Sequence, residues 1–193
     1  MSKGIAILGL NGGGKSTLAH ALAKEINYYE MDAEDYYFPE QKASRQSSLD
    51  KQYDIVCNYL GELPYSVPRE KKVVEQAIYE EIQLHPNFIL AGVTMNWSEK
   101  ILSNLFIAFW IRTPIEERIK RIKEREEKRF GLRVVEGGDM YEQQLEFLKN
   151  VANCSETEVE ESVKKLSCKV VVLDGTNPTS KNVEIMLNST GWK

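Results

Sequence analysis

The sequence predicts an α/β fold in which helices cover both faces of a five-stranded parallel sheet, giving three layers. Five short apolar runs alternate with segments of helical periodicity along the 193 residues. The runs are nearly continuous, as in parallel strands buried on both faces. Polar clusters also follow the runs, and such sheets bind ligands beyond the carboxyl ends of their strands. These clusters occupy residues 9–17, 32–35, 92–96 and 174–177.

The elements follow from these patterns in chain order. Residues 5–8 are the first predicted strand, and residues 15–26 combine helical spacing with strong helix formers. Residues 33–68 are polar and contain prolines, which predicts an irregular or helical excursion. The remaining predicted strands are 28–32, 87–93, 105–111 and 168–176, and the remaining helices are 69–84 and three segments that begin near residues 113, 139 and 177.

Capping residues predict where three helices start. A short polar side chain before a helix accepts a hydrogen bond from the first-turn backbone, and proline suits the first helical position. The predicted caps are Thr113 followed by Pro114, Asp139 in a capping box with Glu142, and Asn177.

Length and charge limit the class of protein. The 193 residues suit one domain spanning residues 1–193. A net charge of −4 argues against broad binding to nucleic acid or to anionic membranes. The first ten residues are too short an apolar stretch for a signal peptide, and the sequence has no membrane-length apolar run. We therefore expect a cytoplasmic protein without membrane or nucleic-acid partners. The sequence leaves its oligomeric state open.

A glycine-rich loop follows the first strand. Residues 9–16 satisfy G-x-x-x-x-G-K-[ST], between a predicted strand and a predicted helix. Glycines let backbone N–H groups turn inward onto phosphate oxygens, a lysine supplies positive charge, and a serine hydroxyl suits Mg²⁺. The alternative is a glycine-rich turn with a chance lysine. The predicted nucleotide-binding residues here are Gly9, Asn11, Gly12, Gly13, Gly14, Lys15, Ser16 and Thr17.

With this loop the chain resembles the small P-loop kinases, such as adenylate kinase, shikimate kinase and uridine kinase. The resemblance implies a five-stranded parallel sheet, a mobile helical lid, and transfer of the ATP γ-phosphate to a small acceptor with Mg²⁺. It places the acceptor-binding excursion at about residues 33–68 and the lid at about residues 118–140.

Two aspartates follow the second strand in the stretch MDAEDYYF. A carboxylate there can take the proton of an acceptor hydroxyl or order Mg²⁺. Residues 34–37 resemble the Asp-Asp-Phe-Tyr stretch of uridine kinase-like enzymes. We predict Asp35 as base and Asp32 near the metal with Ser16; the reverse assignment and a polar loop capped by Asp32 remain alternatives.

The helix after residue 113 is rich in arginine. Arg118, Arg121 and Arg125 share one face, and the spacing of the last two matches the lid arginines of nucleotide kinases. Arginine binds phosphate oxygens in a planar fork, so we predict catalytic roles for Arg121 and Arg125. The alternative is a solvated face paired with glutamates. An isoleucine stripe at 115, 119 and 122 is predicted to dock on the sheet.

The last polar cluster resembles the adenine-binding turn of adenylate kinase-like folds. Its candidate residues are Gly175, Thr176 and Pro178, and an ordinary strand–turn–helix is the alternative. Together these features predict an ATP-dependent kinase with Lys15, Asp35, Arg121 and Arg125 in catalysis and a hydroxyl of a nucleoside or other small metabolite as acceptor. A nucleoside monophosphate kinase and a nucleotide hydrolase or switch are the alternatives.

Overall fold

The predicted sheet is confirmed in a computed structural model, which describes residues 3–42 and 67–191. Five strands lie in the order β2-β3-β1-β4-β5, and each neighbouring pair is parallel. All carboxyl ends therefore lie at one edge of the sheet. The strands are β1 (Gly4–Leu8), β2 (Tyr29–Asp32), β3 (Phe88–Gly92), β4 (Leu105–Arg112) and β5 (Lys169–Asp174).

Helices connect the strands, as the alternation of patterns predicts. None of the helices in the described residues is long and apolar enough to cross a membrane. Much of the predicted excursion, residues 43–66, lies outside the described residues. The helices are α1 (Lys15–Ile26), α2 (Ala33–Tyr37), η1 (Pro39–Gln41), α4 (Lys71–Leu84), α5 (Glu99–Leu102), α6 (Ile115–Phe130), η3 (Gly131–Val134), α7 (Tyr141–Asn153), α8 (Thr157–Lys164) and α9 (Thr179–Thr190).

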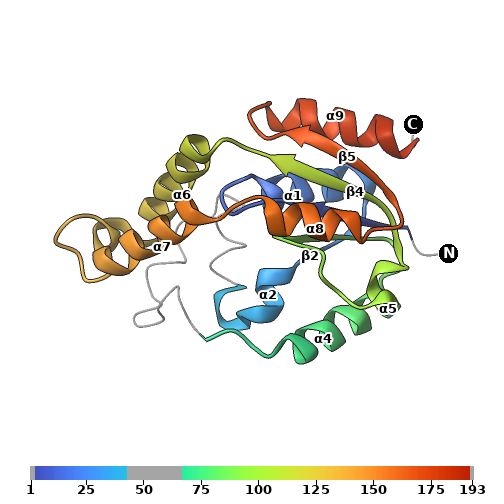
Figure 1. Cartoon of the computed structure of the whole chain (residues 1–193), viewed down its shortest axis with the longest axis horizontal. Helices are drawn as coiled ribbons and strands as arrows, with labels where there is room; N and C mark the ends of the chain where they lie inside the picture. Colours follow the sequence, from blue (N-terminus) through green and yellow to red (C-terminus); the bar gives the residue numbers. More distant parts are fainter. Residues whose placement is uncertain (1–2, 43–66, 192–193) are drawn as a thin grey trace.

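The core forms on both faces of the sheet because successive strand residues point to opposite sides. Ile5 and Ile7 of β1 pack with residues of α1 and α9, whereas Ala6 and Leu8 pack with residues of α4, α5 and α8. Figure 1 shows the sheet between these helices. All five residues of β1 are buried, which explains its unbroken apolar run.

Helices α6 and α7 extend beyond the sheet on one side of the molecule (Figure 1). The prediction that the isoleucine stripe of α6 docks on the sheet is wrong. Ile122 packs against Leu148 and Val151 of α7, with Ile115 and Ile119 beside them. Helical periodicity identifies a buried face but does not identify the element that covers it.

The three predicted helix caps are also wrong. Helix α6 begins at Ile115 with Pro114 as N-cap, α7 follows Met140, and α9 follows Pro178. The polar side chains at the predicted caps make other contacts: Thr113 donates to the Gly13 carbonyl, Asp139 pairs with Arg133, and Asn177 donates to Asn182. These side chains bond to groups other than the backbone N–H groups of the first helical turn.

Candidate active site

The glycine-rich loop joins β1 to α1 at the carboxyl edge of the sheet, as predicted. The Gly13 N–H closes a turn by donating to the Leu10 carbonyl at 3.0 Å. Gly12 has φ +78°, and a Cβ there would lie 2.5 Å from the Arg118 carbonyl oxygen. Only glycine tolerates both conditions, so the loop packs its backbone directly against α6.

Lys15, the first residue of α1, is buried in this loop. Its Nζ donates to the Leu10 carbonyl at 3.3 Å. Burial lowers the pKa of Lys15, while the negative charges of Glu34 and Asp32 act to raise it. A buried cation beside loop amides is suited to phosphate oxygens, which would replace the weak carbonyl contact.

Ser16 and Asp32 meet across the site. The Ser16 hydroxyl donates to Asp32 Oδ2 at 2.6 Å, and Asp32 Oδ1 accepts from the Glu34 N–H at 3.0 Å. Asp32 is thus both the N-cap of α2, as the alternative interpretation expected, and a hydrogen-bond partner of the glycine loop. Its position near a metal stays a prediction. Burial, followed by the charge of Glu34, raises the pKa of Asp32 to about 6.

Glu34 is the acidic residue that the sequence analysis missed. Its charge is the largest electrostatic influence on both Lys15 and Asp32. It therefore lies with them at the carboxyl edge of β2. The available signal was its position two residues after Asp32, the last residue of β2, at the edge where ligands bind. Asp35 is half-buried on the same short helix, where its charge contributes to the raised pKa of Tyr36.

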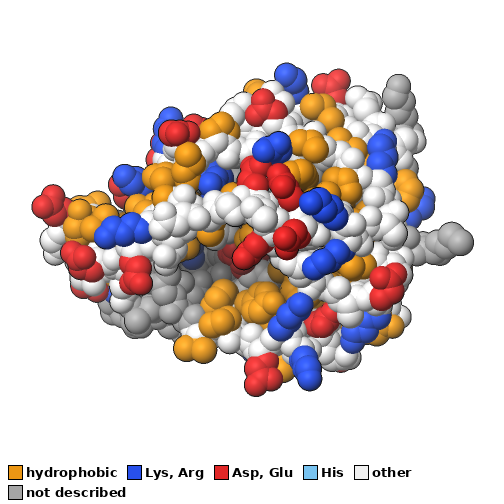
Figure 2. Space-filling view, in the orientation of Figure 1, with side chains coloured by type: hydrophobic (Ala, Val, Ile, Leu, Met, Phe, Trp, Pro, Cys, Tyr) orange, Lys and Arg blue, Asp and Glu red, His pale blue; other side chains and the backbone are white. Residues whose placement is uncertain are grey.

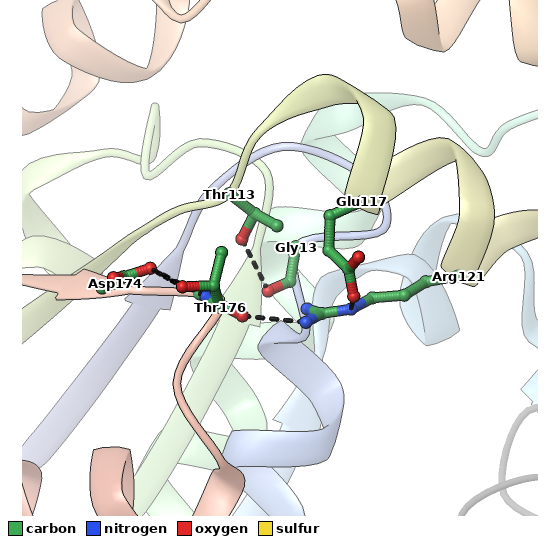
Figure 3. Close-up of polar contacts among 7 residues, drawn as sticks. Gly13, Thr113, Glu117, Arg121, Asp174 and Thr176 are labelled. Atoms are coloured by element: carbon green, nitrogen blue, oxygen red, sulfur yellow. Dashed lines mark hydrogen bonds and ion pairs between the residues drawn. The ribbon is translucent and has the colours of Figure 1, made fainter.

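Arg121 joins α6 to the turn after β5. Its Nη2 donates to the Gly175 carbonyl at 3.0 Å, and its Nε donates to Glu117 at 3.0 Å (Figure 3). Arg125 is more exposed and pairs with Glu126, but its positive charge still acts on Lys15. Arg121 thus contacts the turn beside the glycine loop, whereas Arg125 influences Lys15 through its charge alone.

Arg118 differs from these two arginines. Its residue is only 4% exposed, and its Nη1 donates to the Asn11 carbonyl at 3.3 Å. In the described residues, Arg118 Nε and Asn11 Oδ1 are buried and have no hydrogen-bond partner. Three arginines on one helical face therefore occupy different surroundings.

The turn after β5 packs closely against the glycine loop. Asp174 accepts hydrogen bonds from the N–H and hydroxyl of Thr176, while Thr113 donates to the Gly13 carbonyl (Figure 3). A Cβ at Gly175 would lie 1.8 Å from Thr113 Oγ1, so this position requires glycine. The other predicted residues, Thr17 and Pro178, are exposed near this region.

Comparisons with known proteins agree with this geometry. Residues 5–146 match a family model described as AAA domain. The Bacillus subtilis (strain 168) protein called "Uncharacterized protein YqaC" is 27% identical over 149 residues, covering 77% of this chain and 71% of that protein.

Solved structures of similar fold are P-loop kinases. A shikimate kinase from Acinetobacter baumannii, in complex with shikimate, has a TM-score of 0.55 and 16% identity, covering 100% of this chain and 97% of that chain. A deoxyadenosine kinase from M. mycoides with bound dATP has a TM-score of 0.53 and 15% identity, covering 99% and 100%. At these identities the comparison shows a shared fold.

Proposed function

Since this chain belongs to the AAA domain family and has the fold of the P-loop kinases, we propose that it is an ATP-dependent kinase whose acceptor is a hydroxyl group of a nucleoside or other small metabolite. The observation that carries the proposal is the acidic pair that faces the glycine loop. Glu34 and Asp32 exert their charges on the buried Lys15, and Asp32 accepts a hydrogen bond from Ser16.

The oxygen atoms of Ser16 and Asp32 are suited to bind a magnesium ion that accompanies ATP. Hydroxyl and carboxylate oxygens are ligands that Mg²⁺ prefers, together with water and phosphate oxygens. Ser16 supplies a hydroxyl oxygen and Asp32 supplies a carboxylate oxygen, and these two atoms lie 2.6 Å apart. The pKa of Asp32 is raised because the charge of its carboxylate is poorly stabilised in the folded protein. Bound there, Mg²⁺ would neutralise charge on the β- and γ-phosphates.

The chain's own groups account for the other requirements of phosphoryl transfer. Loop amides and Lys15 would hold the phosphates, and Arg121 and Arg125 would stabilise charge on the transferred group. The acceptor oxygen forms a bond to the γ-phosphorus as the bond to the ADP oxygen breaks. The acceptor proton passes to a carboxylate of α2, for which Glu34 and Asp35 are the candidates.

A carboxylate near the phosphate loop favours a hydroxyl acceptor over a phosphate acceptor. A hydroxyl must lose a proton during transfer, whereas a nucleotide phosphate is already ionised at neutral pH. Repulsion from Glu34 and Asp32 would also oppose a second anion. We therefore rank a nucleoside monophosphate kinase second.

The test is an acceptor panel with ATP and Mg²⁺. Purified protein is incubated with nucleosides, nucleoside monophosphates, sugars or shikimate, and the phosphorylated product is identified by mass spectrometry. We expect ADP and a phosphomonoester to form in equal amounts with one hydroxyl acceptor. The Lys15→Ala variant is the negative control, because this substitution removes the cation within the phosphate loop.

Other results would select the alternatives. Product formation with nucleoside monophosphates alone would support the second-ranked kinase. ADP release at an undiminished rate without any acceptor would identify a hydrolase or switch and would contradict the proposal.

A further inference from the structure

A cavity lies beside the glycine loop, where the carboxyl ends of β4 and β5 approach the start of α6. It has a volume of about 710 Å³, which is within the range of small-molecule sites. Five of its lining residues are apolar: Leu10, Pro114, Ile115, Val172 and Leu173. The wall also contains charged side chains, among them Arg112, Arg118 and Glu156. A pocket that combines apolar surface with placed charged groups can both hold and orient an organic molecule.

Arg118 brings an incompletely hydrogen-bonded guanidinium to the wall of this cavity. The residue lines the cavity and is 4% exposed, and its Nε is buried without a hydrogen-bond partner in the part of the chain that the structure describes. Its Nη1 is held by the Asn11 carbonyl, so the guanidinium is fixed in place. A buried guanidinium N–H without an acceptor is costly unless a ligand supplies one. An anionic oxygen is its strongest partner.

The other charged groups of the cavity already have partners. Arg112 forms an ion pair with Glu156 at 2.5 Å, and Asp174 accepts hydrogen bonds from Thr176. Outside the lining residues, the first turn of helix α8 carries Glu158 and Glu160, and Figure 2 shows acidic side chains around this helix. The charge of Glu156 also acts on Arg118. Because repulsion from these acidic groups grows with each negative charge on a ligand, one carboxylate on Arg118 is favoured over a polyanion.

We propose that this cavity binds a small organic monoanion, with its carboxylate on Arg118 and its apolar body against Leu10, Pro114 and Val172. The ligand would contact the glycine loop at Leu10 and the end of β5 at Asp174, next to the turn that follows. It would therefore lie against both segments assigned to ATP without occupying the phosphate loop. The proposal does not depend on which molecule the protein phosphorylates.

Cys154 allows the binding of a ligand in the cavity to be measured. Its thiol is exposed and its residue lines the cavity. The probe is benzoate, and benzamide is its uncharged counterpart of the same shape. The rate at which N-ethylmaleimide alkylates Cys154 is followed by mass spectrometry of the Cys154 peptide. The half-buried Cys168 lies outside the lining residues and is the internal reference.

We expect millimolar benzoate to slow alkylation of Cys154 severalfold, with benzamide much less effective and Cys168 unaffected. Arg118→Gln should abolish this protection. Val172→Trp should also abolish it by filling the cavity from an exposed position, and this variant leaves the Arg118–Asn11 contact intact. Lys120→Gln removes a charge from an exposed position of α6 and should keep the protection.

Three results would overturn the proposal. One is equal protection by benzoate and benzamide, which would mean that charge is not recognised. Another is undiminished protection in both Arg118→Gln and Val172→Trp. The third is protection by MgATP and none by benzoate, which would assign the cavity to the nucleotide site.

Discussion

The Ser16 hydroxyl and Asp32 Oδ2 lie 2.6 Å apart, linking the first residues of α1 to the end of β2. This contact joins two segments separated by a whole helix in the sequence. It also places a carboxylate with a raised pKa beside the phosphate loop. Keeping that carboxylate charged in the folded protein costs free energy.

Asp32→Asn should stabilise the protein at pH 8 while reducing its phosphoryl-transfer activity. The pKa of Asp32 rises from 3.8 to about 6 on folding, so the folded state binds more protons between these values and its stability falls as pH increases. Asparagine cannot ionise and can still bond Ser16 and the Glu34 N–H. We expect a gain of about 1–2 kcal/mol, less than the full shift implies, because water reaches part of the side chain.

Urea unfolding at several pH values checks this prediction. The advantage of Asp32→Asn should be present above about pH 6 and disappear below about pH 4. Equal stability of the two proteins at pH 8 would show that Asp32 carries no burial cost.

Lys15→Ala should abolish phosphoryl transfer and leave the fold intact. The ammonium group is buried, and within the described residues its hydrogen bond to the Leu10 carbonyl is a long one, 3.3 Å. Its removal therefore costs the sheet little, whereas bound phosphates lose their buried cation. Far-UV circular dichroism and product formation are measured on the same preparation. Normal turnover in a folded variant would contradict the assignment of the loop.

Glu34→Gln and Asp35→Asn form a matched pair that identifies the base. Each keeps the size and hydrogen bonding of the side chain and removes its charge. The variant that lacks the base should lose about 10²-fold or more in kcat, with ATP affinity nearly unchanged. We expect this loss in Glu34→Gln, because Glu34 exerts its charge on Lys15 and Asp32.

Turnover and equilibrium ATP binding distinguish the outcomes for this pair. A large loss in Asp35→Asn alone would return the role to Asp35. If both variants keep full turnover, neither carboxylate accepts the proton and the nucleotide kinase alternative gains support.

Arg121→Ala and Arg125→Ala should each lower kcat by about tenfold or more, with small changes in melting temperature. Arg121 contacts the Gly175 carbonyl beside the loop, and the charge of Arg125 acts on Lys15. Arg133→Ala is the matched control, because Arg133 forms an exposed ion pair with Asp139 farther along the chain. Comparable losses in all three variants would attribute the effect to general loss of positive charge.

The sheet could be predicted from the sequence because its strands are buried on both faces. Residues 5–8 and 88–91 are buried throughout, which leaves unbroken apolar runs that alternate with helical segments. The glycine loop could be predicted as well, since its spacing and flanking elements are local. These features depend on neighbours in the chain.

Two of the predictions that were wrong concern side chains whose contacts are made with residues far away in the sequence. Thr113 has the composition of a helix cap, but the Gly13 carbonyl, 100 residues away, takes its hydroxyl. The isoleucines of α6 have a clear periodicity, but their partners lie on α7. The role of Glu34 could not be predicted, because spacing alone does not show which of two neighbouring carboxylates on a short helix influences Lys15.

The close approach of Gly175 to Thr113 has a consequence for the evolution of this chain. The Cβ of any other residue at position 175 would overlap the Thr113 hydroxyl, which itself holds the Gly13 carbonyl. One substitution at either position therefore disturbs three segments that are far apart in the sequence. Descendant sequences are expected to change positions 113 and 175 together or to retain both, and this pair would then appear as a covarying position in an alignment.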